Sequence, residues 1–175
     1  MPGRLRRLRR FARSERGTTA IEFGLLALPF FAIIAAILET AIVFFAAQIL
    51  DSGVQDTTRL IRTGQAQQAG FTISEFRDEL CDHLYGMFDC DQLKIKVTTI
   101  ATFSAAGVSA PVDPDDGTWT IAEAYDQGQG SSVILVEVYY KWPIVLNFAS
   151  FDLADLPDDT RLLGAARVFR NEPFS

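Results

Sequence analysis

The chain has 175 residues, 49% of them apolar, and a formal net charge of −6 at pH 7. This length allows one membrane segment and one small domain. Residues 1–17 hold seven arginines and one acid, residues 18–50 hold two acids and no Lys or Arg, and residues 51–175 hold nine basic residues and nineteen acids. An acidic body and arginines that directly precede an apolar run both disfavour nucleic acid as a partner.

The basic leader, residues 1–17, is read as an orienting or processing segment. Positive flanking residues stay in the cytoplasm, so the N-terminus is expected inside and the body across the membrane. A Sec-type signal peptide has an apolar stretch of about 7–15 residues before its cleavage site. The run over 18–50 is longer and has no sharp polar end, which favours its retention as an anchor.

A helix over residues 18–50 would measure about 50 Å, whereas the hydrocarbon core of a bilayer is about 30 Å thick. The uncharged segment 23–38 and its flanks are sufficient to cross. With Glu22 near the cytoplasmic interface, Glu39 lies about 25 Å further along the axis, near the outer interface. The apolar residues 41–50 then leave the bilayer and must be covered by the chain's own domain or by another subunit.

Pro29 lies inside the run and is expected to kink or locally unwind the helix. Past the run, apolar spacing of helical period extends the helix to about Arg62, and Gly64 is its expected stop. A polar connection over 65–70 follows. The residues at helical spacing are Leu50, Val54, Thr58 and Ile61.

A second helix is predicted from its start signals. Thr72 and Glu75 form a capping-box pair, and Phe71 and Phe76 occupy the positions of a hydrophobic staple. His83, the sole histidine in the sequence, is read as a surface or half-buried residue rather than as a ligand. The expected buried stripe is Ile73, Phe76, Leu80, Leu84 and Met87.

Three strands are predicted, over 93–103, 133–142 and 161–170. The middle one is apolar on nearly both faces and is expected at the centre of the sheet. The expected fold is therefore α+β: a long N-terminal membrane helix, a second helix and a three-stranded antiparallel sheet. The link 104–132 is expected to be polar with a helical turn around 121–125.

The link 143–159 is unusually apolar for a loop. It can fill the core, contact the membrane interface or contact another subunit, and the sequence does not choose among these. The acidic stretch 113–117 can be a cation loop, but it lacks the ligand spacing of a calcium-binding loop. Its Asp-Pro and Asp-Gly steps are typical of turns.

Cys81 and Cys90 fall in the part expected outside the cytoplasm, where a disulfide is the default for such a pair. Two thiols alone do not make a metal site, so no metal is expected. No Gly-rich phosphate loop follows a strand, and a lone histidine provides no base for a Ser or Cys nucleophile. We therefore expect no catalytic residues, no cofactor and no enzyme activity.

Glu22 is a carboxylate at the head of a membrane helix, which costs about 2.5–3.5 kcal/mol at the bilayer centre and less near the interface. Hydration by lipid headgroups is one way to tolerate it. The other is a cation from a neighbouring chain. A new α-amino group, made by cutting after Gly17, would be such a cation at neutral pH.

The segment that begins at Arg16-Gly17 resembles the class III prepilin-peptidase site of type IV pilin-like proteins. The resemblance implies cleavage between Gly17 and Thr18, which makes Glu22 the fifth residue of the mature chain, with Phe23 beside it. Further stretches resemble the TadE-like subgroup. They are Gly24-Leu25-Leu26-Ala27-Leu28-Pro29, Ile37-Leu38-Glu39, Thr58-Arg59-Leu60-Ile61-Arg62-Thr63-Gly64-Gln65 and Val168-Phe169-Arg170-Asn171-Glu172-Pro173-Phe174.

The resemblance implies a pilin-like minor pseudopilin of the tight-adherence (Flp) pilus system. Such a protein spans the bacterial inner membrane once, is cut by an aspartic prepilin peptidase and acts with other pilin-like subunits and the assembly platform. It has no catalysis of its own. TadF and TadG types share the N-terminal pattern. The expected parts are a cleaved leader (1–17), a transmembrane helix (18–50) and a periplasmic domain (51–175).

Two other classes compete with this hypothesis. An uncleaved single-pass anchor carrying a periplasmic protein-binding module would have the same apolar helix but an intact N-terminus. A membrane-tethered hydrolase would need a nucleophile–base pair, which the sequence does not offer. The mature N-terminus separates the first of these from a pseudopilin.

Overall fold

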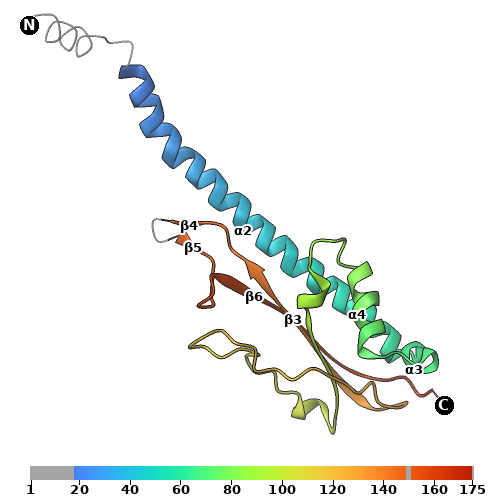
Figure 1. Ribbon diagram of the computed structural model, residues 1–175. Coiled ribbons are helices and arrows are strands. Elements are labelled where there is room, and N and C mark those ends of the chain that lie inside the picture. Colours follow the sequence, from blue (N-terminus) through green and yellow to red (C-terminus); the bar gives the residue numbers. More distant parts are fainter. Residues whose placement is uncertain (1–17, 149–150, 175) are drawn as a thin grey trace, which may run out of the picture. The chain divides into compact units, whose positions relative to one another are not determined.

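The computed structural model describes residues 18–148 and 151–174 (Figure 1). The chain divides into two compact units, Met1–Glu39 and Thr40–Ser175. One helix, α2 (Thr18–Arg62), contributes to both units. The predicted leader, residues 1–17, lies outside the described residues.

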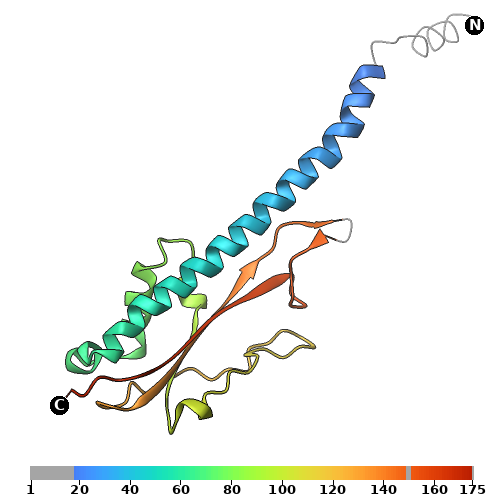
Figure 2. The same cartoon turned by 180° about the vertical axis from the view of Figure 1, so that it is seen from behind.

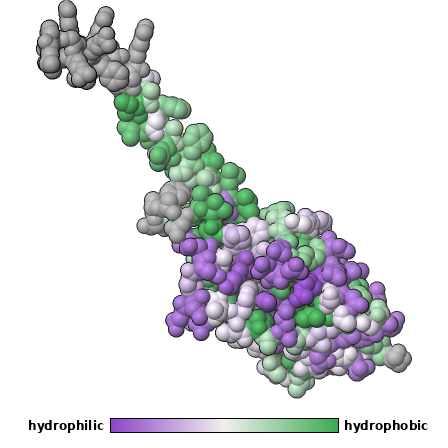
Figure 3. All heavy atoms as spheres, viewed as in Figure 1, coloured by the Kyte–Doolittle hydropathy of each residue, from purple (hydrophilic) through white to green (hydrophobic). Residues whose placement is uncertain are grey.

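The first unit contains the N-terminal part of α2. Its large apolar side chains are exposed all around the helix, and the surface of this part is largely hydrophobic in Figure 3. The helix is uninterrupted at Pro29, and the kink expected there stays a prediction. The exposed large apolar residues before Glu39 are Ile21, Phe23, Leu25, Leu26, Leu28, Phe30, Phe31, Ile33, Ile34, Ile37 and Leu38.

The second unit combines the rest of α2 with short helices and a sheet (Figures 1 and 2). Its helices after α2 are α3 (Gln65–Ala69), α4 (Ile73–Asp82) and the 3-10 turns η2 (Cys90–Gln92) and η3 (Phe103–Ala105). Its strands are β1 (Lys94–Ile100), β2 (Ala124–Tyr125), β3 (Val133–Pro143), β4 (Asn147–Phe148), β5 (Phe151–Asp152) and β6 (Thr160–Arg170).

The main sheet has four strands in the order β2-β1-β3-β6. The α+β class and the central position of β3 are confirmed, and β3 pairs antiparallel with both β1 and β6. The prediction of a purely antiparallel, three-stranded sheet is wrong, because β2 adds a parallel edge through Lys96↔Ala124 and Val97↔Tyr125. A two-residue strand is too short to show alternation in the sequence.

The core lies between one face of this sheet and the helices. From α2 it takes Leu50, Val54 and Ile61, all fully buried as their spacing predicts. Burying a side chain of this kind contributes about 1.5–3 kcal/mol. The other fully or nearly fully buried contributors include Phe76, Leu80, Leu84, Leu93, Ile95, Val97, Val136, Val138, Leu163 and Ala165.

The C-terminal end of α2 is confirmed at Arg62, and Gly64 follows it with a left-handed backbone, φ 82°. A Cβ at Gly64 would lie 2.7 Å from the Phe174 ring, so both the backbone and the close contact require glycine. The polar connection predicted over 65–70 is instead the short helix α3. It is bounded on its far side by Gly70, which is also left-handed.

The start of α4 is also as predicted. Thr72 and Glu75 make a capping box, in which the Thr72 amide donates to the Glu75 carboxylate at 2.6 Å. Phe76 is fully buried. The helix packs closely on α2 at Gly53, where a Cβ would lie 3.3 Å from the side chain of Leu80 in α4 and 3.0 Å from that of Leu84 just beyond it. Glycine therefore lets the two helices approach.

The helical turn predicted around 121–125 is wrong, because Ala124 and Tyr125 are the extended residues of β2. The Glu123 carboxylate accepts from the Ile95 amide at 3.1 Å and from the Arg77 guanidinium at 2.6 Å. These two hydrogen bonds fix the segment along β1. The resulting alignment places β2 at the edge of the sheet.

Candidate membrane and assembly segment

The residues predicted for processing and pairing lie at the start of α2. Gly17 lies outside the described residues, and Thr18 is the first residue of the helix. Glu22 and Phe23 both have exposed side chains, and that of Phe23 is 70% exposed. The structure thus places a carboxylate within an exposed apolar surface, less than two helical turns from the predicted cut.

The helix that carries these residues is long and apolar enough to cross a membrane, and 11% of its most apolar window is buried in the structure. Each large apolar side chain left in water forgoes about 1.5–3 kcal/mol of burial free energy. A surface of this kind is therefore more stable in an apolar environment than in water. A lipid bilayer or the helices of other subunits provide one.

Glu39, the second carboxylate of the helix, ends the first unit. Its side chain is only 9% exposed. A position at the outer interface of the bilayer, as the sequence predicts, remains a prediction.

The apolar residues 41–50 are covered on one side only. Val43, Ala46 and Leu50 belong to the buried core of the second unit. Phe44 and Phe45 are 74% and 60% exposed. The chain's own domain therefore covers this segment only in part and leaves two large aromatic side chains mostly exposed.

The apolar link 143–159 is divided in the same way. Ile144 and Leu153 are partly buried and pack against the core, so they fill it. Val145 is 85% exposed. The short antiparallel pair β4–β5, which the sequence did not indicate, lies within this link.

The Cys81–Cys90 disulfide is formed, with the two Cα atoms 6.1 Å apart. It joins the end of α4 to η2, just before β1. Next to it in sequence, Phe88 packs edge-on against Tyr140 and Trp142 of β3. The bond therefore fixes the loop that connects α4 to the sheet.

The acidic stretch 113–117 makes turn hydrogen bonds. The Asp113 carboxylate accepts from the Asp115 amide at 2.9 Å, and the Asp116 carboxylate accepts from the Thr118 amide at 2.8 Å. The bonds from Thr118 lower the pKa of Asp116. Among the residues the structure describes, no three His, Cys, Asp or Glu side chains are placed to hold a metal ion.

His83 is half-buried and lies 3.7 Å from Glu79.

Sequence reasoning missed the structural role of Asn171. Its side chain is 2% exposed and its amide donates to the carbonyls of Gln127 and Gln129, each at 3.0 Å. The neighbouring Glu172 amide donates to the Arg62 carbonyl at 2.9 Å. The C-terminal tail thereby joins the end of α2 to the loop before β3.

These features define an α+β protein with a single described helix of membrane-spanning length and composition, at its N-terminal end.

Residues 17–59 match the family model described as TadE-like protein. The match makes this segment, about a quarter of the chain, similar to the TadE-like family. It covers the predicted cut site and most of α2, whereas the sheet and the resemblance at 168–174 lie beyond it. Comparison with curated proteins and with solved structures gave no match.

Proposed function

We propose that this chain is a minor pseudopilin that acts in assembly of the Tad (Flp) pilus and has no catalytic activity of its own. The observation that supports this most strongly is Glu22, an exposed carboxylate within the exposed apolar surface of a TadE-like helix. Its partners are other pilin-like subunits, the inner-membrane assembly platform, the prepilin peptidase and the lipid bilayer.

The chain crosses the inner membrane once in this proposal. The leader, with a net charge of +6, holds the N-terminus in the cytoplasm, because positive flanking residues are retained there. The acidic second unit then lies in the periplasm. The Cys81–Cys90 disulfide supports a periplasmic location of the second unit, since disulfides persist in oxidising compartments.

Processing and pairing are linked through one new charge. Cutting after Gly17 creates an α-amino group at Thr18, which is positively charged at neutral pH. An amine on one chain and Glu22 on a neighbouring chain can neutralise each other in apolar surroundings. This reduces the cost of keeping the carboxylate there. Cleavage would therefore favour association of the apolar helices.

The mature N-terminus tests the processing step. The full chain is expressed with and without its prepilin peptidase, and the N-terminus is determined by sequencing or mass spectrometry. Thr18 is expected as the first residue only when the peptidase is present, and Gly17→Val, which alters the cut site, should block the cut. An intact Met1 with the peptidase would instead favour an uncleaved anchor that carries a periplasmic binding module.

Substitution of Glu22 tests the pairing step. Glu22→Gln keeps the shape and removes the charge, so membrane insertion should persist while co-purification with pilin partners and pilus assembly fall. The neighbouring apolar exchange Ile21→Leu is the matched control and should leave both intact. Unchanged association of Glu22→Gln would contradict a role for the charge.

A further inference from the structure

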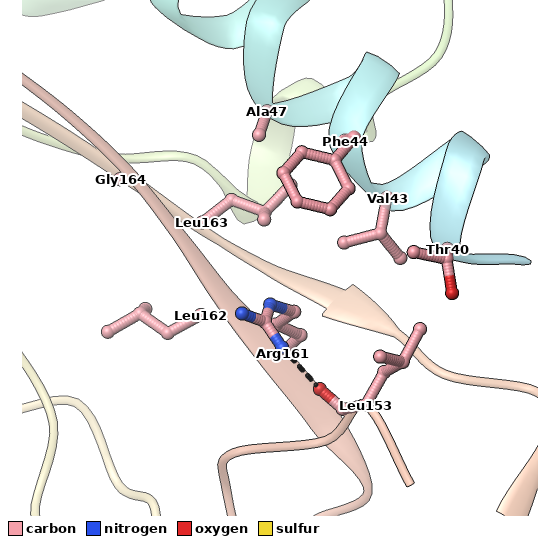
Figure 4. A pocket seen from close by; sticks show the side chains of 9 residues that line it. All are labelled: Thr40, Val43, Phe44, Ala47, Leu153, Arg161, Leu162, Leu163 and Gly164. Atoms are coloured by element: carbon pink, nitrogen blue, oxygen red, sulfur yellow. Dashed lines mark hydrogen bonds between the residues drawn. The ribbon is translucent and has the colours of Figure 1, made fainter. Parts of the chain in front are cut away.

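A cavity of about 310 Å³ opens in the second unit between α2 and β6 (Figure 4). Figure 4 shows Val43, Phe44 and Ala47 directed from α2 toward the strand. Leu162 and Leu163 of β6 and Leu153 complete much of its apolar wall. Such a wall accommodates a hydrocarbon chain better than a polar ligand.

Among the described residues that line this cavity, Arg161 alone has a charged side chain. Its Nη1 donates to the Leu153 carbonyl at 2.9 Å, and the side chain is half-buried. The ion pairs found within residues 18–148 and 151–174 do not include Arg161. A partly buried guanidinium with donors to spare is a favourable partner for an anion, and above all for a phosphate.

Acids on the same link make hydrogen bonds of their own, among them Asp152, whose carboxylate accepts from the Ala154 amide at 2.8 Å. The Asp155 carboxylate accepts from the Leu162 amide at 2.7 Å. The Asp158 carboxylate accepts from Lys141 Nζ at 2.7 Å. Both groups therefore have roles in holding the link to the sheet.

The place of the cavity along α2 matches the edge of a bilayer. Thr40, its first lining residue, follows Thr18 by about 33 Å of helix, close to the thickness of a hydrocarbon core. The exposed Phe44 and Phe45 then fall where aromatic side chains gather at membrane interfaces. Exposed Val145 adds apolar surface to the same unit.

We propose that this cavity binds one anionic phospholipid of the surrounding bilayer. The lipid phosphate contacts the Arg161 guanidinium, and the upper part of one acyl chain lies against Val43, Phe44 and Leu163. This rests on the membrane span of the proposed function. It adds a lipid-binding site with a preference for a negative headgroup, distinct from the helix surface around Glu22.

Native mass spectrometry of the full chain in mild detergent tests the site. The protein is offered equal amounts of phosphatidylglycerol and phosphatidylcholine. A several-fold preference for retained phosphatidylglycerol is expected. Arg161→Gln should abolish this preference. Arg170→Gln is the matched control, because Arg170 is an exposed cation on the same strand, placed over the Phe103 ring.

A second variant tests the apolar part of the site. Ala47→Leu adds volume inside the cavity and should reduce retention of both lipids while thermal unfolding stays close to that of the unmodified chain. Equal retention of the two lipids by the unmodified chain, or a preference that survives Arg161→Gln, would overturn the proposal. Glycerol phosphate bound as well as the lipid would indicate a free-phosphate site and would also overturn it.

Carbonate extraction of membranes separates this proposal from the proposed function. If carbonate extracts the chain from the membrane, the proposed membrane span is wrong. If the chain stays inserted but shows no lipid preference, only the proposed lipid site is wrong.

Discussion

Arg167 of β6 and Asp51 of α2 form an ion pair, with Nη2 and Oδ2 2.6 Å apart. The guanidinium also donates to the Asp51 carbonyl at 3.4 Å. Both side chains are partly exposed, 29% and 41%, so the charge attraction is weakened by solvent. The pair therefore helps to orient β6 on α2 but adds little to the free energy of unfolding.

A double-mutant cycle measures this pair. Arg167→Met, Asp51→Asn and the double variant should give a coupling energy of about 0.5–1 kcal/mol, which decreases in high salt. The measurement is denaturant unfolding of the full chain in mild detergent. A coupling energy of several kcal/mol would show that the pair is effectively buried.

Asn171→Ala should destabilise the second unit by about 1–3 kcal/mol, because the Gln127 and Gln129 carbonyls lose their donors. The adjacent Glu172→Ala is the matched control. Its ion pair with Arg62 spans 3.8 Å between side chains more than half exposed, so its loss should cost less than about 0.5 kcal/mol. Equal unfolding midpoints for the two variants would contradict a special role for Asn171.

Removal of the disulfide should lower the free energy of unfolding by about 2–3 kcal/mol, as expected for closing a short loop. The variant is Cys81→Ser with Cys90→Ser, compared with the oxidised chain by denaturant unfolding. Alkylation before and after reduction counts the thiols. Two reactive thiols in protein isolated from cells without reductant would refute the bond.

The stability that the link 143–159 gives to the fold should depend on pH. The hydrogen bond from Lys141 and then the one from the Thr160 hydroxyl lower the pKa of Asp158 below its ordinary 3.8, and the charge of Lys141 adds a smaller contribution. A carboxyl with a lowered folded-state pKa stabilises the fold fully above the unfolded pKa, and this contribution is lost as pH falls through the folded pKa.

Asp158→Asn should therefore unfold more readily than the unmodified chain near neutral pH, and the difference should shrink below about pH 4. The check is a series of urea midpoints from about pH 6 to about pH 3. Asp159→Asn is the control, since asparagine tolerates the left-handed backbone at that position. A difference that is constant over this range would contradict the assigned pKa shift.

The elements with local signals were predictable from the sequence. The α4 start follows from Thr72 and Glu75, and the α2 end follows from Gly64, because caps and left-handed turns are set within a few residues. The disulfide followed from two cysteines and an expected compartment. The central strand β3 followed from its apolar character on both faces.

The features that sequence reasoning missed depend on partners far away in the chain. β2 exists because Glu123 bonds to Ile95, 28 residues earlier. Asn171 acts on carbonyls 42 and 44 residues before it. Nothing in the residues adjacent to these positions signals such contacts. For the same reason the sequence could not say which face of residues 41–50 the chain covers itself.

The contact between α2 and β6 also bears on how fast the second unit can fold. Asp51 and Arg167 are 116 residues apart, and contacts of such long range form slowly. Until β6 is synthesised, Leu50 and Val54 lack the strand that brings Leu163 and Ala165 into their core. The faces of Leu50 and Val54 that pack on β6 therefore stay uncovered until that strand is in place, and uncovered apolar surface favours aggregation.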